Sequence, residues 1–327
     1  MPLFEDPVIN ALILVGSLVL LDRASDITIA NAVKISDIAR FGRTTVGFVL
    51  VAFCSSLPAL SVSILAAFTE RIDVAVGNAL GSNLVNVCLI LGICLVLAGA
   101  RRTEKTRLLT FMTREEISSL YFGLFIGSAI PLALIYMGYA SRLVGVVLLA
   151  IFVIYTYRLL KPKDIQERLF LDSEPKPSLL KPALLTFWSA VVTVFVSYFI
   201  VDSASSIAES LHLAPAVIGG TVVAFGTSVS VLMASVRAIR RGHADISLGN
   251  IVGTCFVDTT LILGATLTIW TFRVDMTIFS SLVMFSVIAN MFLWYFLSSE
   301  RISWREGVVL LFMYFLFLVI SFSGIKP

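Results

Sequence analysis

The chain is a succession of long apolar runs separated by short polar segments. Ten runs are long enough to cross a hydrocarbon core of about 30 Å as a helix, which takes about 20 apolar residues. They cover residues 8–36, 44–68, 73–99, 115–137, 141–159, 182–209, 214–239, 245–271, 275–298 and 303–324. The sequence therefore predicts an all-α polytopic membrane protein of ten transmembrane helices.

Composition supports this prediction. Hydrophobic residues make up 58% of the chain and charged residues only 14%, whereas about a quarter of the residues in soluble domains are charged. These values exclude a soluble globular protein.

Two stretches of the chain are copies of one segment. Residues 47–92 and 219–264 align without a gap at a constant offset of 172, and 17 of the 46 positions are identical. A repeat of this length defines the architecture. We therefore predict two five-helix halves, residues 1–159 and 182–327, joined by a polar cytoplasmic linker at residues 160–181.

Positive charge is concentrated on one side of the predicted protein, since the odd-numbered loops hold 19 of the 24 Lys and Arg residues. Cytoplasmic loops carry such an excess, so we predict a multi-pass protein of the cell membrane with both termini extracytoplasmic. The compact loops indicate a prokaryotic source. The expected partners are the lipid bilayer and small inorganic cations, not nucleic acid, and the sequence indicates no protein partner.

The odd number of helices in each half has a geometric consequence. The second half must enter the membrane from the opposite face, so the two copies of the repeat are inverted. Inverted repeats are typical of secondary transporters, whose site lies near the midplane where the repeats meet.

Each copy of the repeat places polar side chains in the middle of its helices. Spacing by four residues puts two side chains on one helix face, and both copies use this spacing. The polar positions are Ser55, Ser56, Ser82 and Asn86 in the first copy and Thr227, Ser228, Thr254 and Asp258 in the second. Pro58 removes a helical hydrogen-bond donor, so we predict a helix break there. A milder break is expected in the second copy, where Ser230 replaces the proline.

Asp258 is the only carboxylate in this set, and it lies about four turns into its helix. An ionisable group at such depth is costly and faces a cavity or a partner. Because hydroxyl, amide and carboxylate oxygens suit hard cations, Asp258 and Asn86 are candidate metal ligands. Two alternatives stay open: a protonated Asp258 that bonds a neighbouring helix, and hydroxyls that bond back to their own helix.

These motifs resemble the α-repeats of the cation/Ca²⁺ antiporter superfamily, to which the sodium/calcium exchangers belong. The family pattern is roughly G-T-S-x-P-E, then G-N-x-x-G-S-N-x-x-N or -D. Matching positions are Ser55, Ser56, Asn78, Gly81, Ser82, Asn83 and Asn86 in the first copy, and Gly226, Thr227, Ser228, Asn250, Gly253 and Asp258 in the second.

The resemblance implies a secondary active antiporter that works by alternating access, with helices one and six sliding past a bundle that holds the cations. It also implies which residues line the cation sites. These are Ser55, Ser56, Ser82, Asn86, Thr227, Ser228, Thr254 and Asp258.

The chain departs from the family at the two glutamates, whose positions hold Ala59 and Val231. Ca²⁺ takes six to eight oxygens, including enough carboxylates to balance its charge, and only Asp258 remains. We therefore predict altered selectivity, with Na⁺, H⁺ or another cation as the transported ion, weak binding of Ca²⁺, and no cofactor.

A second class of function also accounts for the lost glutamates: a non-exchanging sensor or regulatory protein on the exchanger scaffold. An enzyme is not expected, because the chain carries no GxSxG or HExxH signature. The remaining small residues of the repeats, and Cys94 just beyond the first copy, are interpreted as helix-packing positions. They are Gly77, Gly81, Gly249, Gly253, Cys54, Cys88, Cys94 and Cys255.

Overall fold

The computed structural model describes residues 7–39, 52–100, 114–160, 180–210, 213–240, 244–273, 276–298 and 303–323. Within these ranges the chain forms ten consecutive helical rods, as the apolar runs predict. The first half comprises α1 (Pro7–Ala39), α3 (Ala52–Phe68), the continuous rod α4 (Ile72–Leu84), η2 (Val85–Ile90) and α5 (Leu91–Ala100), then α6 (Arg114–Met137) and α7 (Arg142–Leu160). The predicted linker lies almost wholly outside the described residues.

The second half follows the same plan. Its first rod is α8 (Leu180–Ser210). The second joins α9 (Pro215–Ile218), η4 (Gly219–Val223), α10 (Ala224–Thr227) and α11 (Val229–Arg240), and the third joins α12 (Ala244–Val257), η5 (Asp258–Ile262) and α13 (Leu263–Ile269). The last two rods are α14 (Met276–Ser298) and α15 (Trp304–Ser323). Elements labelled η are π-helical turns.

One feature of the fold has no counterpart in the prediction. Two-residue strands, β1 (Tyr139–Ala140) and β2 (Phe272–Arg273), pair antiparallel and join the turn after α6 to the turn after α13. Two residues are too few to show the alternating pattern that predicts a strand.

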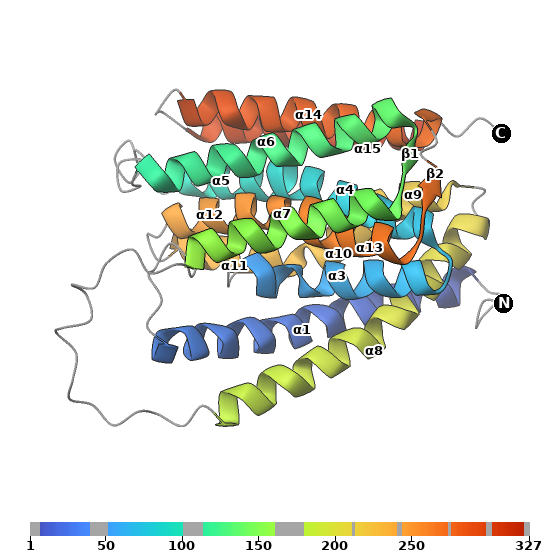
Figure 1. The fold of residues 1–327 in the computed structure, drawn as a ribbon, viewed down its shortest axis with the longest axis horizontal. Coiled ribbons are helices and arrows are strands. Elements are labelled where there is room, and N and C mark those ends of the chain that lie inside the picture. Colours follow the sequence, from blue (N-terminus) through green and yellow to red (C-terminus); the bar gives the residue numbers. More distant parts are fainter. Residues whose placement is uncertain are drawn as a thin grey trace.

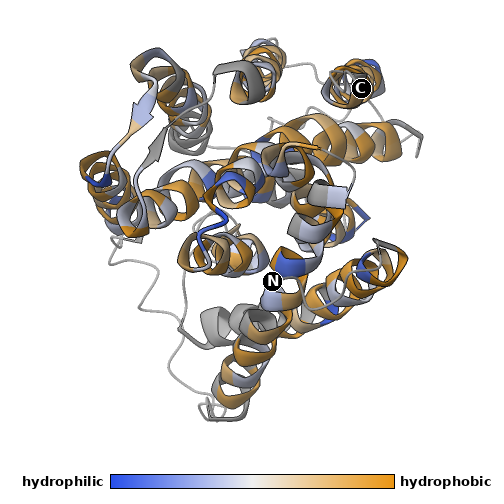
Figure 2. Ribbon diagram, turned by 90° about the vertical axis from the view of Figure 1, so that its right-hand side faces the viewer, coloured by the Kyte–Doolittle hydropathy of each residue, from blue (hydrophilic) through white to orange (hydrophobic). Residues whose placement is uncertain are grey.

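Several helices meet the length and composition needed to cross a membrane. Among the described residues, four do so: Ile72–Gly99, Ser247–Ile269, Phe279–Ser298 and Trp304–Phe322. The bent pair Pro215–Thr227 and Val229–Arg240 counts as a fifth if it is one span. Hydrophobic residues make up most of the helices (Figure 2), and many large apolar side chains are exposed, among them Phe125, Leu143 and Phe315.

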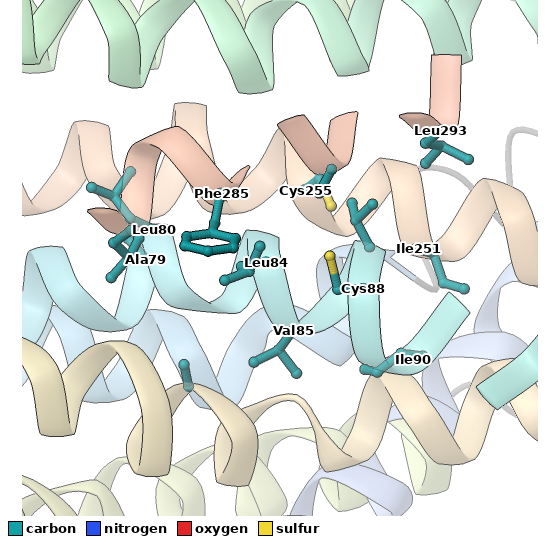
Figure 3. Packing of buried hydrophobic residues seen from close by; sticks show 14 of the residues in the cluster. Ala79, Leu80, Leu84, Val85, Cys88, Ile90, Ile251, Cys255, Phe285 and Leu293 are labelled. Atoms are coloured by element: carbon teal, nitrogen blue, oxygen red, sulfur yellow. The ribbon is translucent and has the colours of Figure 1, made fainter. Parts of the chain in front are cut away.

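The two copies of the repeat run in opposite directions. In Figure 1, α4 and α5 run from right to left, whereas α12 and α13 run from left to right. An apolar cluster fills much of the bundle interior, and Figure 3 shows Phe285 of α14 beside Leu80 and Leu84 of α4.

Helices α1 and α8 form a pair at one side of the bundle (Figure 1). Within the pair, the Asn10 amide donates a hydrogen bond to the Ser206 hydroxyl at 2.9 Å. A separate apolar cluster, which includes Leu21 of α1 and Ile200 of α8, packs the pair against α3, α4 and the α9–η4 segment. The α1–α8 pair therefore packs on the rest of the bundle through an apolar interface that is separate from the main apolar core.

The closest approach between the two halves occurs where α4 crosses the α9–η4 segment. A Cβ at Gly77 would lie 2.5 Å from the Ala216 carbonyl oxygen, and a Cβ at Gly81 would lie 2.5 Å from the Gly220 Cα. Close packing is therefore confirmed at Gly77 and Gly81. At Gly249 no described atom lies within 4 Å. The segment that the repeat would place there, residues 44–48, lies outside the described ranges.

Replacing Gly81 by alanine is expected to destabilise the protein by about 1–3 kcal/mol or more, because the added methyl group meets backbone that cannot move aside cheaply. Thermal unfolding in detergent measures the effect. Gly16→Ala, in α1, is the matched control, since a Cβ at Gly16 meets nothing within 4 Å. Equal melting temperatures for Gly81→Ala and Gly16→Ala would contradict the close approach of α4 to the α9–η4 segment.

Candidate functional site

The centre of the site is a hydrogen bond between repeat-equivalent residues. The Asn86 amide in η2 donates to Oδ2 of Asp258 in η5 at 3.1 Å, and both side chains are fully buried. Residues related by a two-fold axis can bond to each other only when they lie beside that axis. Asn86 and Asp258 therefore mark where the two repeats meet.

Two symmetric contacts flank this pair. The Ser55 hydroxyl of α3 donates to the Asn250 amide oxygen of α12 at 3.2 Å. Its equivalent, the Thr227 hydroxyl of α10, donates to the Asn78 amide oxygen of α4 at 3.0 Å. Each bond joins one repeat to the other, so the repeats hold each other in register around the central pair.

The same asparagines hold the helices within each repeat. Asn78 donates to the Ser63 hydroxyl at 2.9 Å and Asn250 to the Ser235 hydroxyl at 3.1 Å. The repeat alignment carried a signal for this arrangement, because the copies share an asparagine at 78 and 250 and a serine at 63 and 235. None of these four residues is among the predicted site residues.

Four predicted site residues present oxygen atoms with no hydrogen-bond partner among the described residues. These buried atoms are Ser56 Oγ, Ser82 Oγ, Asn86 Oδ1 and Asp258 Oδ1. The Ser56 hydroxyl lies near the Asp258 carboxyl group, and Ser82 precedes Asn86 by one turn on the same helix. Buried oxygens need a donor or a cation, so this group is the candidate cation site.

The other predicted residues are engaged differently. Ser55 and Thr227 direct their hydroxyl protons to asparagine oxygens, and Thr254 bonds back to the Asn250 carbonyl of its own helix at 2.6 Å. Back-bonding was one of the alternatives left open for these hydroxyls. Ser228 is buried at the junction of α10 and α11.

The helix break predicted at Pro58 is wrong. α3 continues through Pro58, whereas the second repeat bends by 41° at Ser228. Hydrogen bonds of two serines account for the bend. The Ser228 N–H is shared between the Ala224 and Phe225 carbonyl oxygens. The Ser230 hydroxyl also donates to the Thr227 carbonyl at 3.4 Å and, across the repeats, to the Ser55 carbonyl at 2.9 Å. Serine hydroxyls that bond to the backbone bend helices.

Both central residues lie in π-helical turns at equivalent places in the repeats, Asn86 in η2 and Asp258 in η5. Such turns interrupt α-helices chiefly at functional sites. No sequence pattern indicated them.

Ala59 and Val231, where the family resemblance expects glutamates, are buried apolar residues. Ala59 is 3% exposed and Val231 is 1% exposed, and neither side chain offers an oxygen. In the described part of the chain, no group of three or more His, Cys, Asp or Glu side chains is placed to hold a metal. Any cation held by the unpaired oxygens would therefore meet one carboxylate, from Asp258.

The cysteines that the structure describes are packing residues. Cys88, Cys94 and Cys255 are buried free thiols, and Cys88 and Cys255 point toward each other among apolar side chains (Figure 3). The side chain of Cys54 lies outside the described set.

Comparisons with known proteins agree on one relationship. A family model described as "Sodium/calcium exchanger protein" matches residues 9–161 and 181–323. The "Putative antiporter CaxA" of Alkalimonas amylolytica is 30% identical, over 77% of this chain and 78% of its own. The "Sodium/calcium exchanger MaX1" of Methanosarcina acetivorans is 28% identical, over 96% of this chain and 99% of its own.

Solved structures show the same fold. A structure of the sodium-calcium exchanger NCX_Mj superimposes with a TM-score of 0.68 at 24% identity, covering 98% of this chain and all of the exchanger chain. The predicted fold of ten helices in two inverted repeats is thereby confirmed.

Proposed function

This chain belongs to the sodium/calcium exchanger family, and from that premise we propose that it is an antiporter with altered selectivity. It is a membrane-embedded cation transporter, as its family membership shows. The proposed cargo is a monovalent cation, Na⁺ or H⁺, which binds at Asp258, Asn86 and the unpaired serine hydroxyls. In this proposal Ca²⁺ is not a substrate.

One observation carries the proposal: the cluster of unpaired oxygens contains a single carboxylate. Asp258 supplies one negative charge, and the Asn86, Ser56 and Ser82 oxygens are neutral. One charge balances a monovalent cation or a proton. Ca²⁺ requires more carboxylate charge and more oxygens than these side chains provide.

The movement proposed for alternating access is the sliding of the α1–α8 pair along the bundle. The separate apolar cluster between the pair and the bundle supports it. Leu18 of α1 also packs directly against Gly226, next to Thr227 and the bend at Ser228. Sliding of α1 would therefore act directly on the rod that carries these hydroxyls.

A flux assay with proteoliposomes that contain only this chain tests the proposal. A panel of Na⁺, K⁺ and Ca²⁺ gradients, each with and without a pH gradient, should show Na⁺- or H⁺-coupled exchange and no exchange of Ca²⁺. Ca²⁺ exchange at a rate comparable with that of Na⁺ would refute the altered selectivity.

A non-exchanging sensor or regulatory protein is the second candidate. The cross-repeat bonds of Ser55, Thr227 and Ser230 favour it, because they occupy groups that the family resemblance assigns to cation binding. A protein of this kind would show no flux in the same liposomes under any gradient. Binding of Na⁺ without flux would support it over the antiporter.

A further inference from the structure

Two buried asparagines connect helices of both repeats beside the candidate cation site. Asn78 in α4 and Asn250 in α12 are repeat equivalents, and each lies about two helical turns before a member of the central pair, Asn86 or Asp258. Their amide oxygens accept hydrogen bonds, whereas that of Asn86 has no partner among the described residues. Oxygens that are already engaged in this way favour a role in holding other side chains over direct cation binding.

The orientation of the Asn78 amide group is fixed by its acceptors. Its nitrogen donates to the Ala59 carbonyl at 3.1 Å and to the Ser63 hydroxyl at 2.9 Å. A carbonyl oxygen can only accept, and the Ser63 hydroxyl donates its own proton to the Ala75 carbonyl at 3.2 Å. Both partners therefore require the amide nitrogen, and the amide oxygen faces Thr227.

This orientation determines the direction of the bond to Thr227. The Asn78 oxygen cannot donate, so the Thr227 hydroxyl directs its proton to it across 3.0 Å. The Ala224 carbonyl of the same helix is the competing acceptor, at 3.3 Å. Because a hydroxyl has one proton and two lone pairs, the bond to Asn78 leaves the Thr227 oxygen with lone pairs for a further donor or a cation.

The second asparagine forms the equivalent bonds from the other repeat. The Asn250 nitrogen donates to the Ser235 hydroxyl at 3.1 Å, and its oxygen accepts from the Ser55 hydroxyl at 3.2 Å. Ser56 follows Ser55 directly, and its buried hydroxyl oxygen is one of the unpaired atoms near the Asp258 carboxyl group. Asn250 thus ties the turn that carries Ser56 to the rod that carries Asp258.

We propose that Asn78 and Asn250 are positioning residues for the cation site. Each directs the hydroxyl proton of one residue in the opposite repeat, Thr227 or Ser55, to its own amide oxygen and leaves the lone pairs of that hydroxyl for the cation. Neither asparagine contacts the cation. This role rests on the proposed cation binding, and it makes affinity depend on two residues outside the set of ligands.

Preorganisation is the physical reason for an effect on affinity. A cation repels a hydroxyl proton that points toward it, so a hydroxyl that rotates freely has to be reoriented when the cation binds. Removal of the groups that orient a metal ligand costs about 10- to 100-fold in affinity or activity. Asn78 and Asn250 fix two hydroxyls before the cation arrives, so their removal should have a cost in this range.

Asn78→Leu tests the proposal in the proteoliposome flux assay. Leucine keeps the branched shape but cannot accept the Thr227 proton, which then turns to the Ala224 carbonyl. The Na⁺ concentration that gives half-maximal flux should rise about 10-fold or more, and in a pH series the half-maximal pH should shift if H⁺ is the cargo. The maximal flux per folded protein should change less. Asn250→Leu, measured in parallel, should act in the same way through Ser55.

A double-mutant cycle separates positioning from a merely structural role. Thr227→Val keeps the side-chain shape and removes the hydroxyl. If Asn78 acts through this hydroxyl, Asn78→Leu should change the half-maximal concentration by less than about 2-fold in the Thr227→Val background. Effects that multiply independently would overturn the proposal. Asn250→Leu with Ser55→Ala is the equivalent cycle, and it decides the question if a variant of the first cycle fails to fold.

Ser63→Ala is the matched control. It removes one partner of the Asn78 nitrogen, while the Ala59 carbonyl still fixes the amide orientation. We expect a lower melting temperature with a half-maximal Na⁺ concentration near that of the wild type, and a shift as large as that of Asn78→Leu would overturn the proposal. A wild type without flux would overturn the proposed function and the positioning role together. Wild-type flux with unchanged half-maximal concentrations in both leucine variants would overturn the positioning role alone.

Discussion

Replacing Asp258 by asparagine is expected to abolish cation exchange. The variant keeps the shape of the side chain and an oxygen that can accept from Asn86, but it removes the one negative charge among the unpaired oxygens. Loss of groups that merely support a metal ligand costs about 10- to 100-fold in affinity or activity. Loss of the carboxylate itself should therefore exceed ~100-fold in flux, measured in proteoliposomes.

The repeat symmetry supplies a matched control for this variant. The double variant Asn86→Asp/Asp258→Asn moves the carboxylate to the equivalent position and keeps an amide–carboxylate bond across the axis. We expect it to regain part of the flux that Asp258→Asn loses, with a similar melting temperature. Wild-type-like flux from Asp258→Asn alone would show that this carboxylate does not carry the cation.

Restoring the two missing carboxylates is expected to create Ca²⁺ binding. The wild type should bind Ca²⁺ weakly, whereas Ala59→Glu/Val231→Glu should bind it on the order of 100-fold more tightly, because affinity follows the number of charged ligands. Isothermal titration calorimetry on the purified protein measures both. The effect should require both substitutions, since each supplies one carboxylate from one repeat.

The control for this pair is Ala59→Gln/Val231→Gln, which adds the same bulk to two buried positions without charge. Its Ca²⁺ affinity should stay near that of the wild type, so that any strain from the larger side chains is separated from the effect of charge. Two results would contradict the proposal that the absence of carboxylates at Ala59 and Val231 makes Ca²⁺ binding weak. One is micromolar Ca²⁺ affinity in the wild type, and the other is an equal gain in Ca²⁺ affinity from the glutamine and glutamate variants.

Repeat symmetry explains why the centre of the site could be predicted. The alignment put Asn86 and Asp258 at equivalent positions, and their opposition across the axis followed from the inverted halves; the structure joins them by a hydrogen bond. Helix number was equally accessible, because runs of apolar residues depend on bilayer thickness and not on tertiary contacts.

Hydroxyl directions were harder to predict, for a physical reason. A serine or threonine in a helix can bond to its own backbone or to a neighbour with small differences in free energy. The Ser55 and Thr227 hydroxyl oxygens in fact lie within hydrogen-bond distance of both kinds of acceptor, a carbonyl of their own helix and an asparagine oxygen of the other repeat. The bend at Ser228 escaped prediction for the same reason, since it depends on bonds made by Ser230 and not on a proline.

The Asn290 side chain shows a different limit. Asn290 lies outside the repeat and is a single amide in an apolar helix, and such a residue has no partner that spacing can identify. Its partner Ser128, whose hydroxyl oxygen accepts a hydrogen bond from the Asn290 amide, lies on α6, which only the folded structure places beside α14.

The paired π-turns have a consequence for how this protein can change during evolution. A π-turn holds one residue more than an α-helical turn, so an α-helix of unchanged length would turn every later side chain of the rod by about 100° around its axis. Removing one residue from Val85–Ile90 or Asp258–Ile262 would instead restore an α-helix and leave Leu91 or Leu263, the residue that follows the turn, on the face that it now packs. Single-residue deletions in these turns should therefore preserve the packing of the later part of the rod and change mainly the local direction of Asn86 or Asp258.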